Sequence, residues 1–311
     1  MGERRIRLLV TGASGLLGIN LCLDAVADFE VTGVVNSRRL AGAPFPQIQV
    51  DFTQPGSAAK IIEDICPQWV VHCAALADLD ACEKNPDLST RLNAHLPGEV
   101  AEACRKVGAR LAHISTDAVF DGERGGYSEE DQPNPQSVYA RDKWLGEQAV
   151  LQANPQAIVA RVNFYGWSLL GQRSLAEKFF YTLSAGRGMM GFTDVYFCPL
   201  VNRHLAHILL EMLEKGLEGL YHVFSRECQS KYAFGVALAR RFGLDAGLIR
   251  PVSVQEAGLS ARRSPNLTMR VDKIEAALGH PMPGQEEELE AFYRLYQEGY
   301  PQRLRTMVAV E

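Results

Sequence analysis

The sequence predicts an α/β protein whose first half is a doubly wound parallel sheet, and three observations support this prediction. Apolar, strand-like runs alternate with amphipathic, helix-like segments from the N-terminus to about residue 165. A glycine-rich turn separates the first apolar run from the first helix-like segment. The 311 residues suffice for one large domain or two smaller ones with a sizeable core.

The alternation assigns the elements in order. The strand-like runs of the first half are 7–10, 31–35, 48–50, 69–74, 111–115 and 158–162. Helix-like segments lie between them at 16–27, 57–65, 88–107 and 139–153. After residue 166 the rhythm weakens, and we expect helices at 175–184, 204–215, 232–242 and 289–297, a strand at 219–224 and a loop at 191–199. Because ligands of such sheets sit beyond the carboxyl ends of the strands, the strand-end residues should carry the function.

The turn after the first strand has the spacing of a dinucleotide-binding loop. Gly12 permits a tight turn, Gly15 lets the backbone approach a pyrophosphate, and Gly18 allows the helix to pack closely on the sheet. The helix N-terminus then offers free N–H groups to phosphates. The other residues of this turn expected to contact a cofactor are Ser14, Leu16 and Leu17. Since a glycine turn can also be purely structural, the signal needs support from the rest of the chain.

The end of the second strand bears on the choice of cofactor. Its residues are Asn36 and Ser37, followed by Arg38 and Arg39. An NAD site usually has an acidic residue here to bind the ribose hydroxyls, and this stretch has none. Guanidinium groups bind phosphate in a charge-assisted fork, which favours the 2′-phosphate of NADP(H) over NAD(H). The alternative is that at least one of the two arginines is a solvated loop charge.

Two further strand ends supply candidate cofactor contacts. The third ends at Asp51 and Phe52, and Asp51 could accept a hydrogen bond from an adenine amino group or cap the helix that begins near Gly56. His72, in the fourth strand, is more typical of a core histidine than of a catalyst. The fourth strand ends in small residues that would leave room for a flat cofactor: Cys73, Ala74 and Ala75.

The fifth strand and the helix after it carry the candidate catalytic residues. The strand ends in Ser115 and Thr116, and Tyr139 and Lys143 lie four residues apart on one face of the helix. A nearby ammonium stabilises a phenolate, so we expect it to lower the pKa of Tyr139 and make this tyrosine a usable proton donor at neutral pH. A Tyr–Lys pair is common on exposed helices, but here it follows a glycine turn and a strand-end Ser–Thr pair.

Composition narrows the class of protein. A net charge of −5 argues against nucleic-acid binding through a basic face, and no apolar stretch approaches the roughly 20 residues of a membrane span. The cysteines are odd in number, scattered and without a C-x-x-C motif, so we expect a reduced, cytoplasmic protein with neither a disulfide framework nor a zinc site. They are Cys22, Cys66, Cys73, Cys82, Cys104, Cys198 and Cys228. His204, His207 and Glu211 have helical spacing compatible with a metal, but a solvated polar stripe is commoner, and we expect no metal.

Taken together, these motifs resemble the extended short-chain dehydrogenase/reductase superfamily. Within it the chain is similar to the dTDP-4-dehydrorhamnose reductase family, which also includes the regulatory β subunit of methionine adenosyltransferase. The segments that carry the resemblance are 11–18, 72–75, 78–83, 114–122, 139–147, 165–166, 219–223 and Arg263. The resemblance implies a Rossmann-type cofactor domain at 1–165 and a smaller substrate-binding lobe at 166–311, with a segment near 197–215 returning to the first domain.

The resemblance also implies roles for individual residues. Tyr139 would protonate a carbonyl oxygen as the nicotinamide delivers hydride, Lys143 would bind the nicotinamide ribose, and Thr116 would hydrogen-bond the reacting oxygen. Asn93 would support the active-site strand, although it could also be an ordinary helix-surface residue. Three additional residues are expected at the cofactor: Asn93, Ser115 and Val162. The expected substrate contacts are Asp78, Asp117, Ala118, Tyr165, Trp167, Arg262 and Arg263. Tyr165 and Trp167 could stack on a sugar or base, but core packing is the favoured interpretation of both rings.

Three departures from the family pattern concern the substrate. Ala118 stands where the family usually has tyrosine, Ala77 replaces a usual threonine, and Arg263 is followed by Ser264 where proline is usual. These changes leave the cofactor prediction intact. The favoured hypothesis is an NADP(H)-dependent reductase of a nucleotide-activated 4-keto-6-deoxysugar, with a homodimer as the possible assembly. The alternatives are a non-catalytic NADP-binding regulatory subunit and a nucleotide-sugar epimerase with bound NAD.

Overall fold

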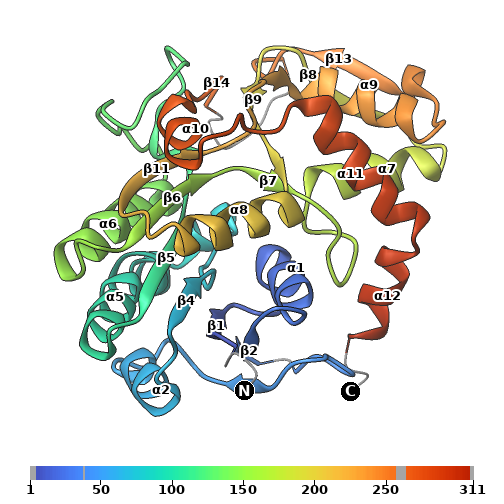
Figure 1. The fold of residues 1–311 in the computed structure, drawn as a ribbon. Coiled ribbons are helices and arrows are strands. Elements are labelled where there is room, and N and C mark those ends of the chain that lie inside the picture. The colour runs from blue at the N-terminus through green and yellow to red at the C-terminus, as the bar shows by residue number, and fades with distance from the viewer. Residues whose placement is uncertain (1–4, 38, 257–263, 309–311) are drawn as a thin grey trace.

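Seven parallel strands form the central sheet of the computed structural model, which describes residues 5–37, 39–256 and 264–308. The strand order is β11-β6-β5-β4-β1-β2-β3 (Figure 1). The strands are β1 (Arg7–Thr11), β2 (Glu30–Val35), β3 (Gln47–Gln49), β4 (Trp69–His72), β5 (Arg110–Thr116), β6 (Ile158–Val162) and β11 (Gly219–Val223). The order reverses between β1 and β4, and such a switch point is where doubly wound sheets bind ligands.

Helices cover both faces of this sheet, which confirms the predicted fold class. One layer contains α2 (Ser57–Ile65), α5 (Leu96–Val107) and α6 (Val138–Ala153), and the other contains α1 (Leu16–Ala25) and α8 (Asn202–Glu214) (Figure 1). Side chains alternate between the two layers along each strand: Leu8 and Val10 join the core beneath α1, whereas Leu9 joins the core beneath α2 and α5. This alternation explains why the strands read as nearly continuous apolar runs.

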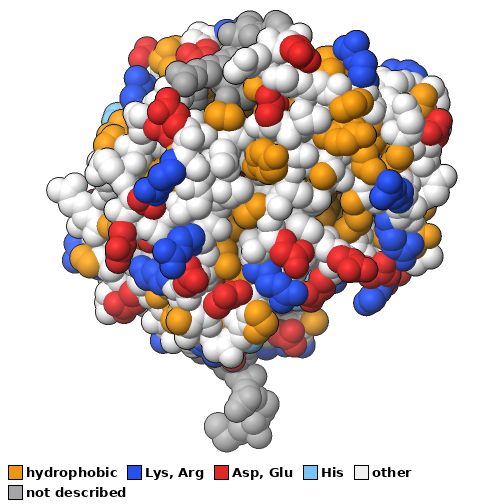
Figure 2. Space-filling model, turned by 90° about the horizontal axis from the view of Figure 1, so that it is seen from above, with side chains coloured by type: hydrophobic (Ala, Val, Ile, Leu, Met, Phe, Trp, Pro, Cys, Tyr) orange, Lys and Arg blue, Asp and Glu red, His pale blue; other side chains and the backbone are white. Residues whose placement is uncertain are grey.

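The second half adds small sheets and helices to one end of the molecule. In these sheets β7 (Phe164–Tyr165) pairs with β10 (Leu200–Val201), β8 (Met189–Phe192) with β13 (Ile249–Val252), and β9 (Tyr196–Phe197) lies between β12 (Gln229–Ser230) and β14 (Asn266–Leu267). The helices are α7 (Leu175–Ser184), α9 (Lys231–Arg241), α10 (Asp272–Leu278), α11 (Gln285–Gln297) and α12 (Tyr300–Thr306). The loop expected at 191–199 therefore contains strand residues. On the face over this half, basic and acidic side chains are interspersed (Figure 2).

One predicted helix is interrupted. Instead of a single helix at 88–107, the chain forms α4 (Pro86–Ser89), a π-helical turn (Thr90–His95) and α5. A π-helical turn is rare and is found mostly at functional sites. Here the π-helical turn packs against α6, and its side chains form hydrogen bonds with α6 and with the segment that follows β4, as described below.

The expectation that every cysteine is reduced is wrong for one pair. Cys198 follows β9 and Cys228 precedes β12, and the two form a disulfide with their Cα atoms 4.2 Å apart. Because β9 and β12 pair antiparallel, these cysteines come to lie opposite each other despite a separation of 30 residues. In the ranges that the structure describes, no helix is both long and apolar enough to cross a bilayer.

Candidate active site

A cleft of about 530 Å³ opens at the carboxyl ends of β1, β2 and β4. Its volume is in the range of small-molecule and cofactor sites. The first half of the chain supplies one part of its wall: Gly12, Ser14, Gly15, Leu16, Asn36, Ser37, Arg39, Leu40, Asp51, Phe52, Thr53, Cys73, Ala74, Ala75 and Leu92. The second half supplies Ser168, Leu169, Leu170, Arg173, Met307 and Val308. Most of the predicted cofactor contacts therefore converge on one cleft.

The glycine turn of the cleft has no space for side chains. Gly12 has a φ of +68°, and a Cβ there would lie 2.9 Å from the amide nitrogen of Ala74. Gly18 does not line the cleft but packs behind the turn, where a Cβ would collide with the carbonyl oxygen of Gly12. The N-cap of α1 is Gly15, whose position has no side-chain cap. The first N–H groups of α1 are thus available for an anion, as a pyrophosphate site requires.

The end of β2 carries polar and basic groups into the cleft. Asn36, Ser37 and the exposed Arg39 line it, whereas Arg38 lies outside the described residues. Asp51 also lines the cleft, but its Oδ1 accepts hydrogen bonds from the backbone N–H and the hydroxyl of Thr53, at 2.9 and 2.7 Å. The helix-capping alternative for Asp51 is therefore wrong, because this local turn occupies the carboxylate. The hydrogen bonds with Thr53 also lower the pKa of Asp51.

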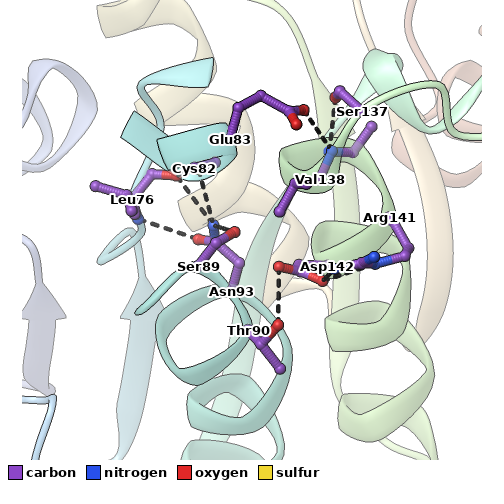
Figure 3. Close-up of polar contacts among 11 residues, drawn as sticks. Leu76, Cys82, Glu83, Ser89, Thr90, Asn93, Ser137, Val138, Arg141 and Asp142 are labelled. Atoms are coloured by element: carbon purple, nitrogen blue, oxygen red, sulfur yellow. Dashed lines mark hydrogen bonds and ion pairs between the residues drawn. The ribbon is translucent and has the colours of Figure 1, made fainter. Parts of the chain in front are cut away.

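Asn93 lies in the π-helical turn and supports the cleft from behind. Its Oδ1 accepts from the N–H of Leu76 and its Nδ2 donates to the carbonyl of Leu76, both at 3.0 Å (Figure 3). Its Nδ2 also contacts Ser89 Oγ at 3.2 Å. The side chain is fully buried, so the alternative of an ordinary surface residue is wrong. Asn93 is not on the cleft wall; it holds the segment that follows β4, from which Ala74 and Ala75 project.

Two more predicted cofactor residues are in the interior instead. Ser115 donates a hydrogen bond to Glu147, and Glu147 also binds Arg161 in a buried ion pair of 2.8 Å. Val162, at the end of β6, is buried. Neither Ser115 nor Val162 lines the cleft, and the same holds for Leu17, because neighbouring helix and strand residues cover all three.

The N-terminus of α6 places Tyr139 and Lys143 beside the end of β5. Ser137 caps the helix through the N–H of Ala140, and Glu83 accepts a hydrogen bond of 2.9 Å from the N–H of Val138 (Figure 3). This contact joins α6 to α3 (Leu79–Lys84). Asp142, which precedes Lys143 in the helix, is buried and accepts a hydrogen bond of 3.2 Å from the hydroxyl of Thr90 in the π-helical turn. The start of α6 is thereby held on two sides.

Lys143 is buried and points at β5. Its Nζ donates to the carbonyl oxygen of Ile114 at 2.6 Å and lies 3.4 Å from Nε2 of His113. Burial lowers the pKa of Lys143 to about 8, against the smaller opposing effect of Glu147. Cys73 lines the cleft, and the Lys143 ammonium is near enough to oppose the burial that raises the pKa of the Cys73 thiol. Lys143 itself is not on the cleft wall, and neither are Tyr139 and Thr116.

The expected lowering of the Tyr139 pKa is wrong. Burial raises this pKa, the Asp117 carboxylate raises it further, and hydrogen bonding with Thr116 has the opposite effect. Lys143, whose ammonium is directed at the carbonyl of Ile114, is not among the groups that shift this pKa. The phenol therefore keeps its proton at neutral pH, which suits a group that gives a proton to a developing oxyanion. Thr116 lies beside it at the end of β5, with Oγ1 accepting from the N–H of Ala118.

Most of the predicted substrate residues have structural partners. Asp78 caps α3 through the N–H of Ala81, and Asp117 is buried, accepting a 2.6 Å hydrogen bond from Asn163. Tyr165 and Trp167 are buried in an aromatic core, where Trp167 stacks on a phenylalanine of α11. Core packing, the favoured interpretation of these two rings, is therefore confirmed, and neither ring is available to stack on a substrate. Arg262 and Arg263 lie outside the described residues.

No pattern in the sequence predicted the second-half wall of the cleft. Residues 168–173 form a loop before α7, and Met307 and Val308 follow α12. Val308 forms a β-bridge with Leu40, which brings the end of the chain to the segment after β2 (Figure 1). The one local signal was the Ser174–Glu177 capping box that starts α7. It marks a helix start but not the cleft in front of it.

Comparison with known proteins places this geometry in a family. A family model described as the RmlD substrate binding domain matches residues 6–298. Two relatives are reductases by name: the probable low-salt glycan biosynthesis reductase Agl14 of Haloferax volcanii is 34% identical, covering 91% of this chain and 95% of the relative, and the dTDP-4-dehydrorhamnose reductase of Mycobacterium tuberculosis is 35% identical, covering 85% and 84%. Methionine adenosyltransferase 2 subunit beta of Bos taurus is 31% identical, covering 86% and 81%.

A solved structure agrees in fold and contains a nicotinamide cofactor. The dTDP-4-dehydrorhamnose reductase from Bacillus anthracis, in complex with NADP, superposes with a TM-score of 0.83 at 26% identity, covering 94% of this chain and 99% of that one. The resemblance inferred from the sequence motifs is confirmed by these matches.

Proposed function

The chain belongs to the RmlD substrate binding domain family, and we propose that it is an NADP(H)-dependent reductase of the 4-keto group of a nucleotide-activated 6-deoxysugar. Its membership of a family of reductases that use a nicotinamide cofactor supports the general chemistry. One observation carries the proposal: Cys73, directly after β4, lines the glycine-turn cleft, and Thr116, Tyr139 and Lys143 lie together at the end of the neighbouring strand β5 and the start of α6. A cofactor held by the turn would have these polar groups at its reactive end.

The residues of the cleft fit a dinucleotide. The uncapped N-terminus of α1 and the absence of any room for a Cβ at Gly12 are features of a cradle for a pyrophosphate. The end of β2 has no carboxylate, and Arg39 lines the cleft there. This favours NADP(H) over NAD(H), because a guanidinium binds a 2′-phosphate more strongly than a ribose hydroxyl. When bound, the cofactor would supply the hydride.

The chain's own groups would handle the proton. Tyr139, whose raised pKa keeps it protonated, would give its hydroxyl proton to the ketone oxygen as negative charge develops there. Thr116 would donate to the same oxygen, so both hydroxyls would bind the transition state more strongly than the ground state. Lys143, held at Ile114, would hold the ribose of the nicotinamide against the carboxyl ends of β4 and β5. The closed, partly buried setting of Tyr139 would strengthen each of these interactions.

The direct test is turnover by the purified chain. We expect dTDP-4-dehydrorhamnose to cause oxidation of NADPH, followed by absorbance of the reduced nicotinamide, with NADH slower and no reaction without the sugar. NADPH binding without oxidation would favour the regulatory-subunit hypothesis. Tightly bound NAD released from the denatured protein would favour the epimerase. The assembled Thr116, Tyr139 and Lys143 set supports turnover over the regulatory-subunit hypothesis, and Arg39, with no acidic residue at the end of β2, favours the reductase over the epimerase.

Tyr139→Phe tests the proton donor. Removing one hydroxyl should lower kcat by about 100-fold or more, the usual contribution of a general acid, while the Kd for NADPH stays within about twofold. Tyr296→Phe, at an exposed tyrosine of α11, is the matched control and should retain wild-type kcat. Retained turnover in Tyr139→Phe would remove this residue from the mechanism.

A further inference from the structure

An arginine from the second half of the chain, Arg173, lies on the wall of the dinucleotide cleft. Arg173 and Arg39 are the cationic side chains among the described lining residues. Both are exposed, and in the described part of the chain no hydrogen bond or ion pair engages either guanidinium. Many other arginines of this structure are paired with carboxylates or carbonyls, as Arg91 and Arg203 are. Two free guanidinium groups in one cleft are suited to an anion that carries more than one phosphate.

A buried carboxylate shapes the loop that carries Arg173. Glu177 is fully buried, and its two oxygens accept hydrogen bonds from the backbone N–H groups of Ser168 (2.6 Å), Arg173 (3.0 Å) and Ser174 (3.1 Å). The hydroxyl of Ser168 donates to the same carboxylate. Burying a carboxylate is costly unless its oxygens are satisfied, and here the satisfying groups all belong to one short loop. The backbone of residues 168–174 is therefore fixed before any ligand arrives.

The loop is also tied to the phosphate-binding end of α1. The carbonyl oxygen of Trp167, at the start of the loop, accepts from Asn20 Nδ2 at 3.1 Å, and Asn20 belongs to α1. Asn202 Nδ2 contacts both Trp167 O and the carbonyl of Leu16, the first residue of α1, at 3.5 and 3.1 Å. The loop thus begins beside the N-terminus of α1, where the free N–H groups lie. Arg39 precedes Leu40, which forms the bridge with Val308.

We infer that Arg173 binds the pyrophosphate of the dinucleotide from the side opposite the glycine turn. The amide groups of α1 would hold the phosphates on one side and the guanidinium on the other, leaving Arg39 for the 2′-phosphate. Glu177 acts as a positioning residue, because it fixes the backbone of Arg173 without touching the ligand. This inference rests on the proposed function, since it requires that the cleft binds a nicotinamide dinucleotide.

Arg173→Ala and Arg187→Ala together test it. Both remove an exposed arginine, but Arg187 follows α7 and does not line the cleft, so Arg187→Ala is a matched control for charge and for fold. The Kd of each purified variant is measured with NADPH and with NADH. Loss of a charge-assisted contact to the pyrophosphate, which both cofactors share, should weaken binding of both by a similar factor of about 10 to 100. Arg187→Ala should bind both as the wild type does.

Three results would overturn the inference. Wild-type affinity of Arg173→Ala for both cofactors would show that the guanidinium makes no contact. Weakened binding of NADPH with unchanged binding of NADH would move the contact to the 2′-phosphate. Equal weakening of cofactor binding in Arg187→Ala would show that the effect comes from the net charge of the protein and not from a contact of Arg173. Failure of the wild-type chain to bind either cofactor would overturn the proposed function itself. If the wild type binds and Arg173→Ala binds equally well, only the inference about Arg173 fails.

Discussion

Single side chains in this site are controlled by burial more than by their neighbours in sequence. Tyr139 and Lys143 share a helix face, yet the lysine is directed to the carbonyl of Ile114, and burial moves the two pKa values in opposite directions. The pKa of the phenol rises and that of the ammonium falls, because burial disfavours whichever form is charged. His113, next to Lys143, is buried too, and its pKa is lowered well below the ordinary value, so it stays neutral.

The lowered pKa of Lys143 predicts how stability depends on pH. Its folded value of about 8 is below the ordinary value of 10.5, so between these pH values the unfolded chain binds more protons than the folded one. The free energy of unfolding should therefore rise with pH across this window, by about 3 kcal/mol from this group. Lys143→Met should lack this rise.

Denaturant unfolding from pH 7 to pH 10 checks the prediction. The quantity of interest is the difference between wild type and Lys143→Met at each pH, because other groups that titrate in the window affect both proteins alike. A difference that does not change with pH would contradict a lowered pKa of Lys143.

At the scale of elements, α6 is the part of the fold that assembles the chemistry. Its start is bound by Ser137 and Glu83, and one turn beyond Lys143 it presents Glu147 to the sheet. Glu147 accepts from Ser115 of β5 and pairs with Arg161 of β6, so one carboxylate ties the helix to two strands. On the other side the π-helical turn contacts α6 through Thr90. The position of Tyr139 relative to Thr116 follows from these attachments.

Glu147→Ala should therefore destabilise the whole protein. Removing one partner leaves the Arg161 guanidinium buried and unpaired, which typically costs about 3–5 kcal/mol of unfolding free energy. The matched control is Glu290→Ala, which breaks the exposed Arg241–Glu290 pair and should change stability little. Urea unfolding of both variants gives the comparison. Similar small losses in the two would show that the Glu147–Arg161 pair contributes no more than a surface pair.

At the scale of the whole molecule, the two halves are joined around the N-terminal turn of α1. Asn20, fully buried in α1, donates to the carbonyls of Leu16 and Trp167 and accepts from the hydroxyl of Tyr300 at 2.8 Å. One side chain thus links the cofactor half to the loop before α7 and to α12. The final described residues then return to the segment after β2 through the Leu40–Val308 bridge. The cleft is consequently a property of both halves and not of the sheet alone.

Asn20→Leu tests this joint. The leucine is similar in size, but it leaves the buried Tyr300 hydroxyl and Trp167 carbonyl short of a partner, at about 1–3 kcal/mol for each group. We expect a loss of about 2–4 kcal/mol in unfolding free energy and weaker NADPH binding, because residues 168–173 lose their tether. Gln152→Leu, on the exposed side of α6, should change neither quantity. Full stability with full affinity in Asn20→Leu would show that the halves are held together elsewhere.

The local pattern of the sequence was enough to predict the sheet, most of its helices and the strand-end residues of the first half that line the cleft. Strand and helix periods, the spacing of Gly12, Gly15 and Gly18, and the four-residue step from Tyr139 to Lys143 are all short-range features. Each follows from geometry within one or two elements. For that reason the fold class, and the part of the cleft contributed by the first half, could be predicted without a structure.

Other features depended on which distant segments pack together. The burial of Tyr165 and Trp167, the Cys198–Cys228 disulfide, the Glu147–Arg161 pair and the place of Arg173 in the cleft all join residues separated by 14 to more than 100 positions. The same holds for the direction of the Tyr139 pKa shift, which burial decides. Sequence periodicity determines which face of an element is apolar, but only tertiary packing determines what that face meets, how much water remains there, and therefore which charges are stable.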